Sequence, residues 1–188
     1  MTENPPPNPA FDLMANHLSE AALEVFAAYD VAIRRCATML PAMIGVERSA
    51  VAVIGYAGEG VRGALVLVAA ESAIRAWMAA VGVPEGDIAD TIGEFSNMLL
   101  GRLKGRLGDQ GMTIHAATPT TAMGSELRLS TPPGLSACST FDGPGWKVSA
   151  RLDANFDPGF ELPVFCRVSR PAQAGDGILF VSGPRSER

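Results

Sequence analysis

The chain has 188 residues, of which 47% are hydrophobic and 19% charged, enough to bury the core of a single domain. The formal net charge is -5, and the basic residues are spread along the chain, which argues against a nucleic-acid partner. The longest apolar run, residues 64–70, is too short to cross a bilayer, and the first residues lack the basic and apolar regions of a secretory signal. We therefore expect a cytoplasmic protein with no membrane partner.

The N-terminal region predicts a lead-in followed by a long helix. Residues 1–14 are proline-rich and carry little that could form a core, so we expect them to be flexible. Ser19 is a candidate N-cap, and apolar residues recur at helical spacing from Ala21 to Leu40, before Pro41. The sequence predicts one helix over this span.

A hairpin and a short helix follow. Residues 50–56 and 61–68 are rich in valine and are separated by Ala-Gly-Glu-Gly, a turn sequence typical of a β-hairpin. Residues 71–81 repeat apolar side chains at helical intervals and stop at Gly-Val-Pro.

A second long helix is predicted from Asp87, the candidate cap, through Leu107, with a Gly-rich stop after it. Beyond it the pattern becomes extended, at residues 112–116, 126–130, 137–141, 147–152, 164–168 and 178–181. This order predicts an α+β fold in which two long helices pack on a mainly antiparallel sheet. We expect one domain over residues 15–182 and a short tail at 183–188.

The second long helix has two unlike faces. At about 100° per residue its apolar side chains form one stripe, and the residues opposite that stripe are polar or lack a side chain. The stripe contains Ile88, Ile92, Phe95, Leu99 and Leu103, and the opposite face contains Asp90, Glu94, Asn97, Gly101, Lys104 and Gly108. Periodicity alone is satisfied by a solvated surface. Glycines in a helix, however, each cost roughly 1 kcal/mol relative to alanine, which suggests that something needs room on this face.

A four-part motif on this helix resembles that of a known family. Asp90, Glu94 and Asn97, followed after 21 residues by Pro119, match the D/S-x3-E-x2-N-x21-P signature of the CheC, CheX and FliY phosphatases of bacterial chemotaxis. Gly101 fits the N-x3-G pattern that follows the family's asparagine. The resemblance extends over roughly residues 15–150, and its specific motifs lie between residues 90 and 124. The predicted first helix has no second E-x2-N, which is why the chain resembles CheX most.

The resemblance implies a mechanism. The helix would dock on a phosphorylated CheY-like receiver domain, where Asn97 would orient a water molecule toward the aspartyl-phosphate and Glu94 would pair with the receiver's lysine. Asp90, Gly101 and Lys104 would contact the partner, although Asp90 could instead stabilise the first half of its own helix through the macrodipole, and Pro119 would shape a turn. The divalent metal, Mg²⁺, would belong to the receiver, so the resemblance implies neither a metal site nor a cofactor on this chain. It also implies a homodimer that pairs through its sheets.

Other functions fit the sequence less well. His17 and His115 have no Cys, Asp or Glu at metal-ligand spacing, and the three cysteines include no C-x-x-C pair and are expected to be reduced. No phosphate-binding glycine loop is present. The alternative that stays open is an adaptor of the same fold that binds a receiver or another signalling partner without hydrolysing its phosphate.

Overall fold

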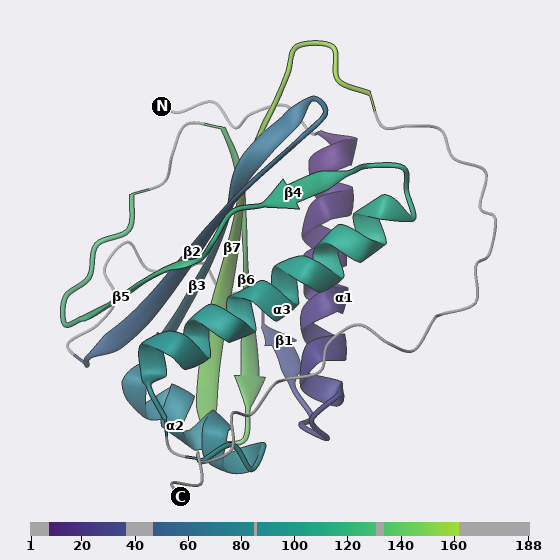
Figure 1. Ribbon diagram of the computed structural model, residues 1–188. Helices are drawn as coiled ribbons and strands as arrows, with labels where there is room; N and C mark the ends of the chain where they lie inside the picture. The colour runs from purple at the N-terminus through teal and green to yellow at the C-terminus, as the bar shows by residue number, and fades with distance from the viewer. Residues whose placement is uncertain (1–7, 37–46, 85, 131–133, 162–188) are drawn as a thin grey trace, which may run out of the picture.

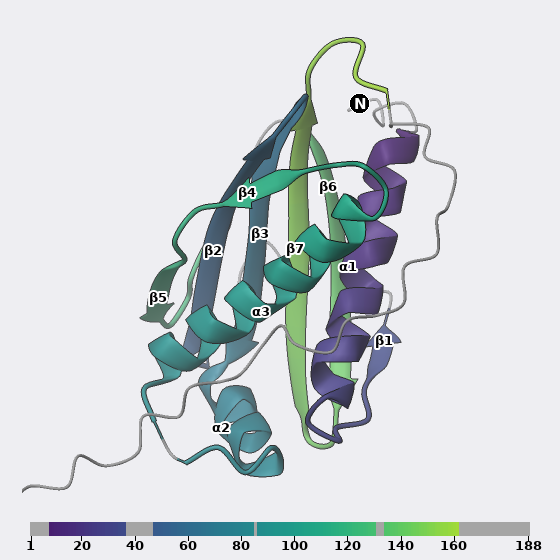
Figure 2. The same cartoon turned by 45° about the vertical axis from the view of Figure 1, so that its right-hand side comes forward.

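The computed structural model describes residues 8–36, 47–84, 86–130 and 134–161. Helices α1 (Pro9–Ala27) and α3 (Ile88–Gly108) lie side by side on one face of a sheet, and α2 (Glu71–Ala80) lies at the end of the sheet near the start of α3 (Figures 1 and 2). None of these helices is long and apolar enough to span a membrane.

Among the described residues the sheet has seven strands, and all their pairings are antiparallel. The strands are β1 (Arg34–Cys36), β2 (Ser49–Gly58), β3 (Val61–Ala70), β4 (Ile114–Ala116), β5 (Thr120–Gly124), β6 (Leu135–Gly143) and β7 (Trp146–Phe156). Their order is β1-β6-β7-β3-β2-β4, and β5 also pairs with β2. The predicted α+β fold, with two long helices on an antiparallel sheet, is therefore confirmed.

Strands β4 and β5 together form one edge of the sheet, and a bulge separates them. β4 ends opposite Tyr56 of β2, whereas β5 begins opposite Val53. Residues 54–55 of β2 therefore stand opposite three residues, 117–119. One extra residue on one strand is the definition of a β-bulge, which bends the strand and re-aims its side chains.

The core lies between the sheet and the helices. Its centre is a group of four aromatic rings from four elements, α1, α2, α3 and β7. The ring centroid of Phe26 lies 4.9 Å from that of Phe95 and 5.0 Å from that of Trp146, and the centroid of Trp77 lies 4.9 Å from that of Phe95. The apolar stripe predicted for α3 is buried throughout, with Leu99 and Leu103 fully inaccessible. The amphipathic prediction for this helix is confirmed.

The prediction for the first helix was wrong at both ends. α1 begins at Pro9, because Asn8 caps it by accepting a hydrogen bond from the Phe11 backbone N–H, at 3.0 Å. Phe11 and Met14 are buried in the core, so residues 9–14 are not a flexible lead-in. Ser19, the predicted cap, lies inside the helix.

The C-terminal end of that prediction also fails. The helix stops at Ala27, and Asp30 adopts a positive φ of 56°, which ends helical geometry. Residues 34–36 then form β1 instead of continuing the helix.

The other element predictions have mixed outcomes. The hairpin and α2 are confirmed, and three later predicted strands correspond to β4, β6 and β7. Residues 126–130 do not form a regular strand: Leu127 and Leu129 instead cover a small valine cluster in the sheet. The sequence missed β5. The predicted strands at 164–168 and 178–181, the tail at 183–188 and residues 1–7 lie outside the described residues.

Candidate functional site

Helix α3 carries the motif and is fixed at its N-terminus by a local cap. The Asp87 side chain accepts a hydrogen bond of 2.7 Å from the Ala89 N–H, and the Thr91 hydroxyl donates one of 2.9 Å to the Asp87 carbonyl. This confirms Asp87 as the cap and satisfies N–H and C=O groups at the helix start.

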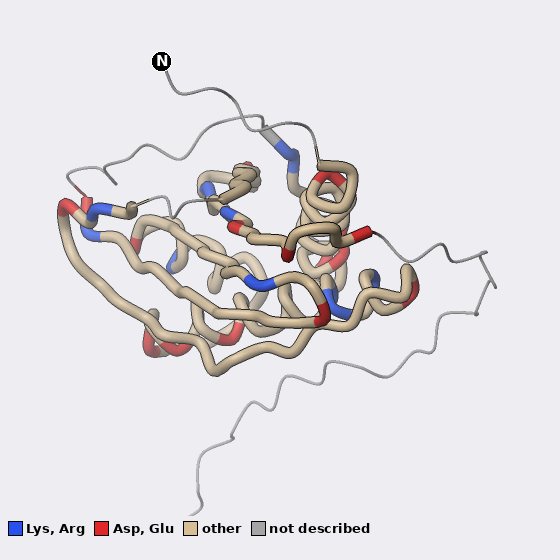
Figure 3. Tube along the Cα trace, turned by 90° about the horizontal axis from the view of Figure 1, so that it is seen from above, with Lys and Arg blue, Asp and Glu red and all other residues tan. Residues whose placement is uncertain are grey.

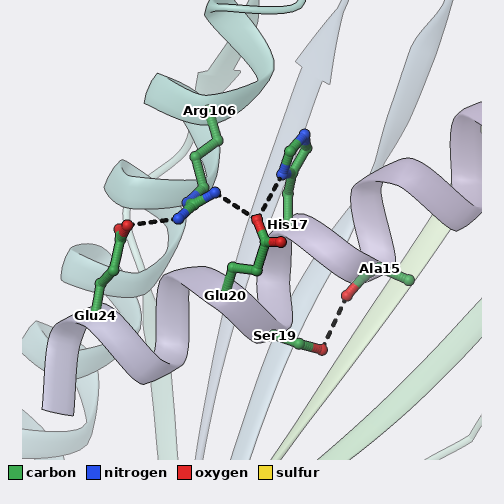
Figure 4. A network of polar contacts seen from close by, with 6 residues as sticks. All are labelled: Ala15, His17, Ser19, Glu20, Glu24 and Arg106. Atoms are coloured by element: carbon green, nitrogen blue, oxygen red, sulfur yellow. Dashed lines mark hydrogen bonds and ion pairs between the residues drawn. The ribbon is translucent and has the colours of Figure 1, made fainter. Parts of the chain in front are cut away.

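Ion pairs fix the C-terminal half of α3 against α1. Arg106 reaches between Glu20 and Glu24 and donates to both carboxylates, while His17 contacts Glu20 at 3.1 Å (Figure 4). Exposed ion pairs contribute little individually, but a guanidinium shared by two carboxylates on successive turns constrains the rotation of the helix. With the aromatic core beneath, α3 has a defined exposed face.

The motif residues lie together on that face. Asp90, Glu94, Gly101 and Lys104 are exposed and Asn97 is half-buried. Within the part of the chain that the structure describes, the side chains of Glu94 and Asn97 make no hydrogen bond or ion pair. Their side chains therefore have unused hydrogen-bonding capacity: the carboxylate can accept, and the amide can both donate and accept.

Asn97 is turned toward the β4–β5 edge. Gly93, one turn earlier, is buried against β5, since a Cβ at this position would lie 3.3 Å from the Thr121 methyl carbon. At about 100° per residue, Asn97 lies roughly 40° from Gly93 and 60° from Glu94 around the helix. The amide of Asn97 therefore lies between the exposed face of α3, which carries Glu94, and the edge strand β5. Sequence analysis did not identify Gly93, because its spacing within the helix carries no signal of its partner.

Three exposed glycines of α3, Gly101, Gly105 and Gly108, form a line without side chains that we call the outer ridge. A Cβ placed on Gly101, Gly105 or Gly108 would meet nothing within 4 Å, so no packing contact of the described residues explains them. Their helix-destabilising effect is not offset by close packing.

Tyr29 borders the other flank of the motif. Its hydroxyl donates to the Met98 sulfur at 3.5 Å, and burial raises the pKa of its phenol. The sequence placed Tyr29 inside a helix, and no local pattern predicted that it would meet α3.

Features away from α3 offer no competing catalytic constellation among the described residues. They contain no group of three His, Cys, Asp or Glu side chains arranged to hold a metal ion. A shallow depression lies on the sheet face away from the helices, lined in part by Arg62, His115 and Asn155, and it shares no residue with the motif. Acidic and basic residues both occur along the described trace (Figure 3), and in α3 the acidic residues Asp90 and Glu94 lie in the first half and the basic residues Arg102, Lys104 and Arg106 in the second.

Solved structures define the class of fold. A putative chemotaxis protein from Desulfovibrio vulgaris Hildenborough aligns with a TM-score of 0.62 and 18% identity over 76% of this chain and 96% of its own. The chemotaxis protein CheX from Desulfovibrio desulfuricans aligns with a TM-score of 0.61 and 20% identity over 76% of this chain and 99% of its own. A chain of the CheX–CheY–BeF3–Mg²⁺ complex from Borrelia burgdorferi aligns with a TM-score of 0.58 and 14% identity over 77% of this chain and 96% of its own. The protein thus has the fold of CheX and CheC-like chemotaxis proteins.

The family comparison points the same way. The family model for chemotaxis phosphatase CheX matches residues 50–141, just under half of the chain, and this span includes β2, β3, α2 and the whole of α3. The resemblance to CheX indicated by the motif is confirmed. No curated protein matches the sequence significantly.

Proposed function

We propose that this protein is a phosphatase that hydrolyses the aspartyl-phosphate of a CheY-like response regulator. The observation that carries the proposal is the pairing of Glu94 and Asn97 on the exposed face of α3, with no partner among the described residues, in a CheX-like fold. That the protein compared from Borrelia burgdorferi is in complex with CheY supports a receiver as partner.

Asn97 is the catalytic amide in this proposal. Its side chain holds a water molecule in line with the phosphorus, the water oxygen attacks, and the bond between phosphorus and the aspartate oxygen breaks. The products are inorganic phosphate, which takes up the water's oxygen and both of its protons, and the free receiver carboxylate. Phosphoryl transfer depends on positioning and charge neutralisation, and an amide positions water without titrating.

Glu94 is the docking carboxylate. It pairs with the receiver's active-site lysine and so places α3 over the phosphoryl group. Asp90, Gly101 and Lys104, on the same exposed face, contact the receiver around this point, and Pro119 shapes the β4–β5 connection. The receiver supplies the aspartyl-phosphate and the Mg²⁺ that neutralises it. Both proteins meet in the cytoplasm.

The test is the rate at which a phosphorylated CheY-type receiver loses phosphate, with and without catalytic amounts of this protein. We expect the wild-type protein to accelerate the loss and Asn97→Ala to abolish the acceleration while keeping the wild-type circular dichroism spectrum, since the side chain is not part of the core. An Asn97→Ala variant with wild-type turnover would refute the water-positioning role. Tight binding without acceleration by the wild type would instead identify an adaptor.

A further inference from the structure

The β4–β5 bulge changes which side chains face α3. Thr121 pairs with Ala52, a core residue on the helix side of β2, and its methyl group lies against Gly93, so Thr121 faces α3. Side chains alternate along a strand, so Thr120 points to the opposite sheet face and Pro119 back toward the helix.

Counting from β4 gives the second half of the pattern. Ala116 pairs with Tyr56, whose side chain is in the core on the helix side. Ala117 then faces away, in agreement with the 3.9 Å between its Cβ and a Cβ placed on Gly55. Thr118 therefore faces the helix side, as Pro119 does. Without the extra residue, two adjacent positions could not share one face.

These two positions lie level with the motif. The chain turns after α3 and runs back along it through β4 and β5 (Figures 1 and 2). Measured from the Gly93–Thr121 contact, Asn97 is roughly 6 Å along the helix and Pro119 roughly 7 Å along the strand. Thr118 is roughly 10 Å along the strand, between the levels of Asn97 and Gly101.

The surface between them is open to a partner. Thr118 and Gly101 are exposed, and Asn97 and Pro119 are half-buried. Gly101 has no side chain, and a Cβ placed there would meet nothing within 4 Å, so α3 leaves open space at about the level of Thr118. That hydroxyl can donate one hydrogen bond and accept others.

We propose that Thr118, on the β4–β5 bulge, is a second docking contact that touches the receiver beside the phosphorylation site and helps to determine which receiver binds. This inference rests on the proposed function. It extends the docking surface from one helix to the sheet edge beside it, where Thr118 is 21 residues from Asn97 in sequence. Thr118 contacts the receiver and takes no part in the reaction.

The experiment compares Thr118→Arg with Thr120→Arg. Both threonines are exposed on the same edge, two residues apart, but they face opposite sides of the sheet. The substrate is a CheY-type receiver phosphorylated by a small acyl-phosphate donor, and steady-state titration gives KM and kcat. We expect Thr118→Arg to raise KM at least about tenfold with kcat within about twofold, and Thr120→Arg to leave both within about twofold.

Milder substitutions and a fold control accompany the arginine pair. Thr118→Ser should keep the wild-type KM, whereas Thr118→Ala should raise it about threefold, as the loss of one hydrogen bond does. A variant that unfolds at the same temperature as the wild type has kept its fold. If Thr118→Arg does not fold, the KM values of Thr118→Ser and Thr118→Ala decide between the outcomes. Equal KM values for the Thr118 and Thr120 variants, with an active wild type, would overturn this inference alone. A wild type that neither binds nor dephosphorylates receivers would overturn the proposed function together with it.

Discussion

Glu94 and Asn97 are three residues apart on one face of α3, but their chemistry assigns them different kinetic roles. Only the carboxylate can form an ion pair with a lysine, whereas only the amide can both donate to and accept from a water molecule. The half-buried position of Asn97, turned toward the β4–β5 edge, also differs from the exposed position of Glu94. Docking and chemistry should therefore be separable by mutation.

We predict that Glu94→Gln raises the receiver concentration for half-maximal rate about tenfold and makes the reaction less sensitive to salt, because a screened charge contact is lost. Asn97→Ala should instead lower the limiting rate with affinity nearly kept, as expected for an interaction made mainly in the transition state. Titrations with phosphorylated receiver at two salt concentrations measure both effects. The opposite pattern, with Glu94→Gln losing only rate and Asn97→Ala only affinity, would show that the roles are inverted.

Tyr56 is a residue-scale feature of the core with a measurable pH signature. Its side chain is 4% exposed, and its hydroxyl donates a 2.8 Å hydrogen bond to the Asp153 carbonyl. Burial, and secondarily the charge of Asp153, raise the pKa of Tyr56 far above its usual value of 10.0. The folded phenol thus stays neutral at pH values at which the unfolded one ionises, so its contribution to stability is complete below pH 10 and declines above it.

We predict that Tyr56→Phe lowers the free energy of unfolding by about 1 kcal/mol at pH 7 through loss of the hydrogen bond. Between pH 7 and pH 11 the stability of the wild type relative to the variant should fall by about 1.4 kcal/mol, because only the wild type loses the contribution of the neutral phenol, so that at pH 11 the variant becomes slightly the more stable protein. Urea unfolding of both proteins at the two pH values measures this change in relative stability. The pH-dependent contributions of all other titratable groups are common to the two proteins and cancel in the difference. A difference that is independent of pH would contradict the raised pKa.

At the scale of elements, the bare ridge of α3 predicts that the helix can be stabilised. Gly101→Ala and Gly105→Ala should each raise the free energy of unfolding by about 0.5–1 kcal/mol, because a Cβ there meets nothing within 4 Å and alanine is the better helix former. Urea unfolding is the measurement. A loss of stability at either position would mean that the ridge is not open.

Gly93→Ala is the matched control in the same helix. Its Cβ would lie 3.3 Å from the Thr121 methyl carbon, so the gain in helix propensity should be offset by crowding against β5. If the bare ridge serves docking, the stabilised Gly101→Ala protein should also need more receiver for half-maximal rate. A wild-type KM in that variant would separate the glycine from docking.

At the scale of the whole molecule, we propose a homodimer. Within the described residues, the strands at both edges of the sheet, β1 and the pair β4 and β5, are paired on one side only, which leaves an edge available to a second copy. The expected mass in solution is twice 19.6 kDa. Light scattering at micromolar concentration measures it, and a monomer mass would contradict the proposal.

The features that the sequence predicted well depend on neighbours in the chain. The Asp87 cap, the buried stripe of α3 and the β2–β3 turn each arise from contacts within a few residues, so composition and spacing were enough to predict them. The face of α3 that bears Glu94 and Asn97 follows from the same periodicity. Once one stripe of a helix is buried, the opposite side must be exposed.

The features that it missed depend on residues far apart in the chain. The short strand β1, in a segment that the sequence predicted as helix, depends on pairing with β6, more than 100 residues later. The sequence Thr-Thr-Ala-Met-Gly of β5 is mostly exposed at an edge and lacks the apolar alternation that marks a half-buried strand. The bulge between β4 and β5 exists only as a mismatch of register against β2. The sequence by itself thus determined the helix that carries the motif and its exposed face, whereas tertiary packing decided what lies beside that face, because register and close approach are properties of paired elements.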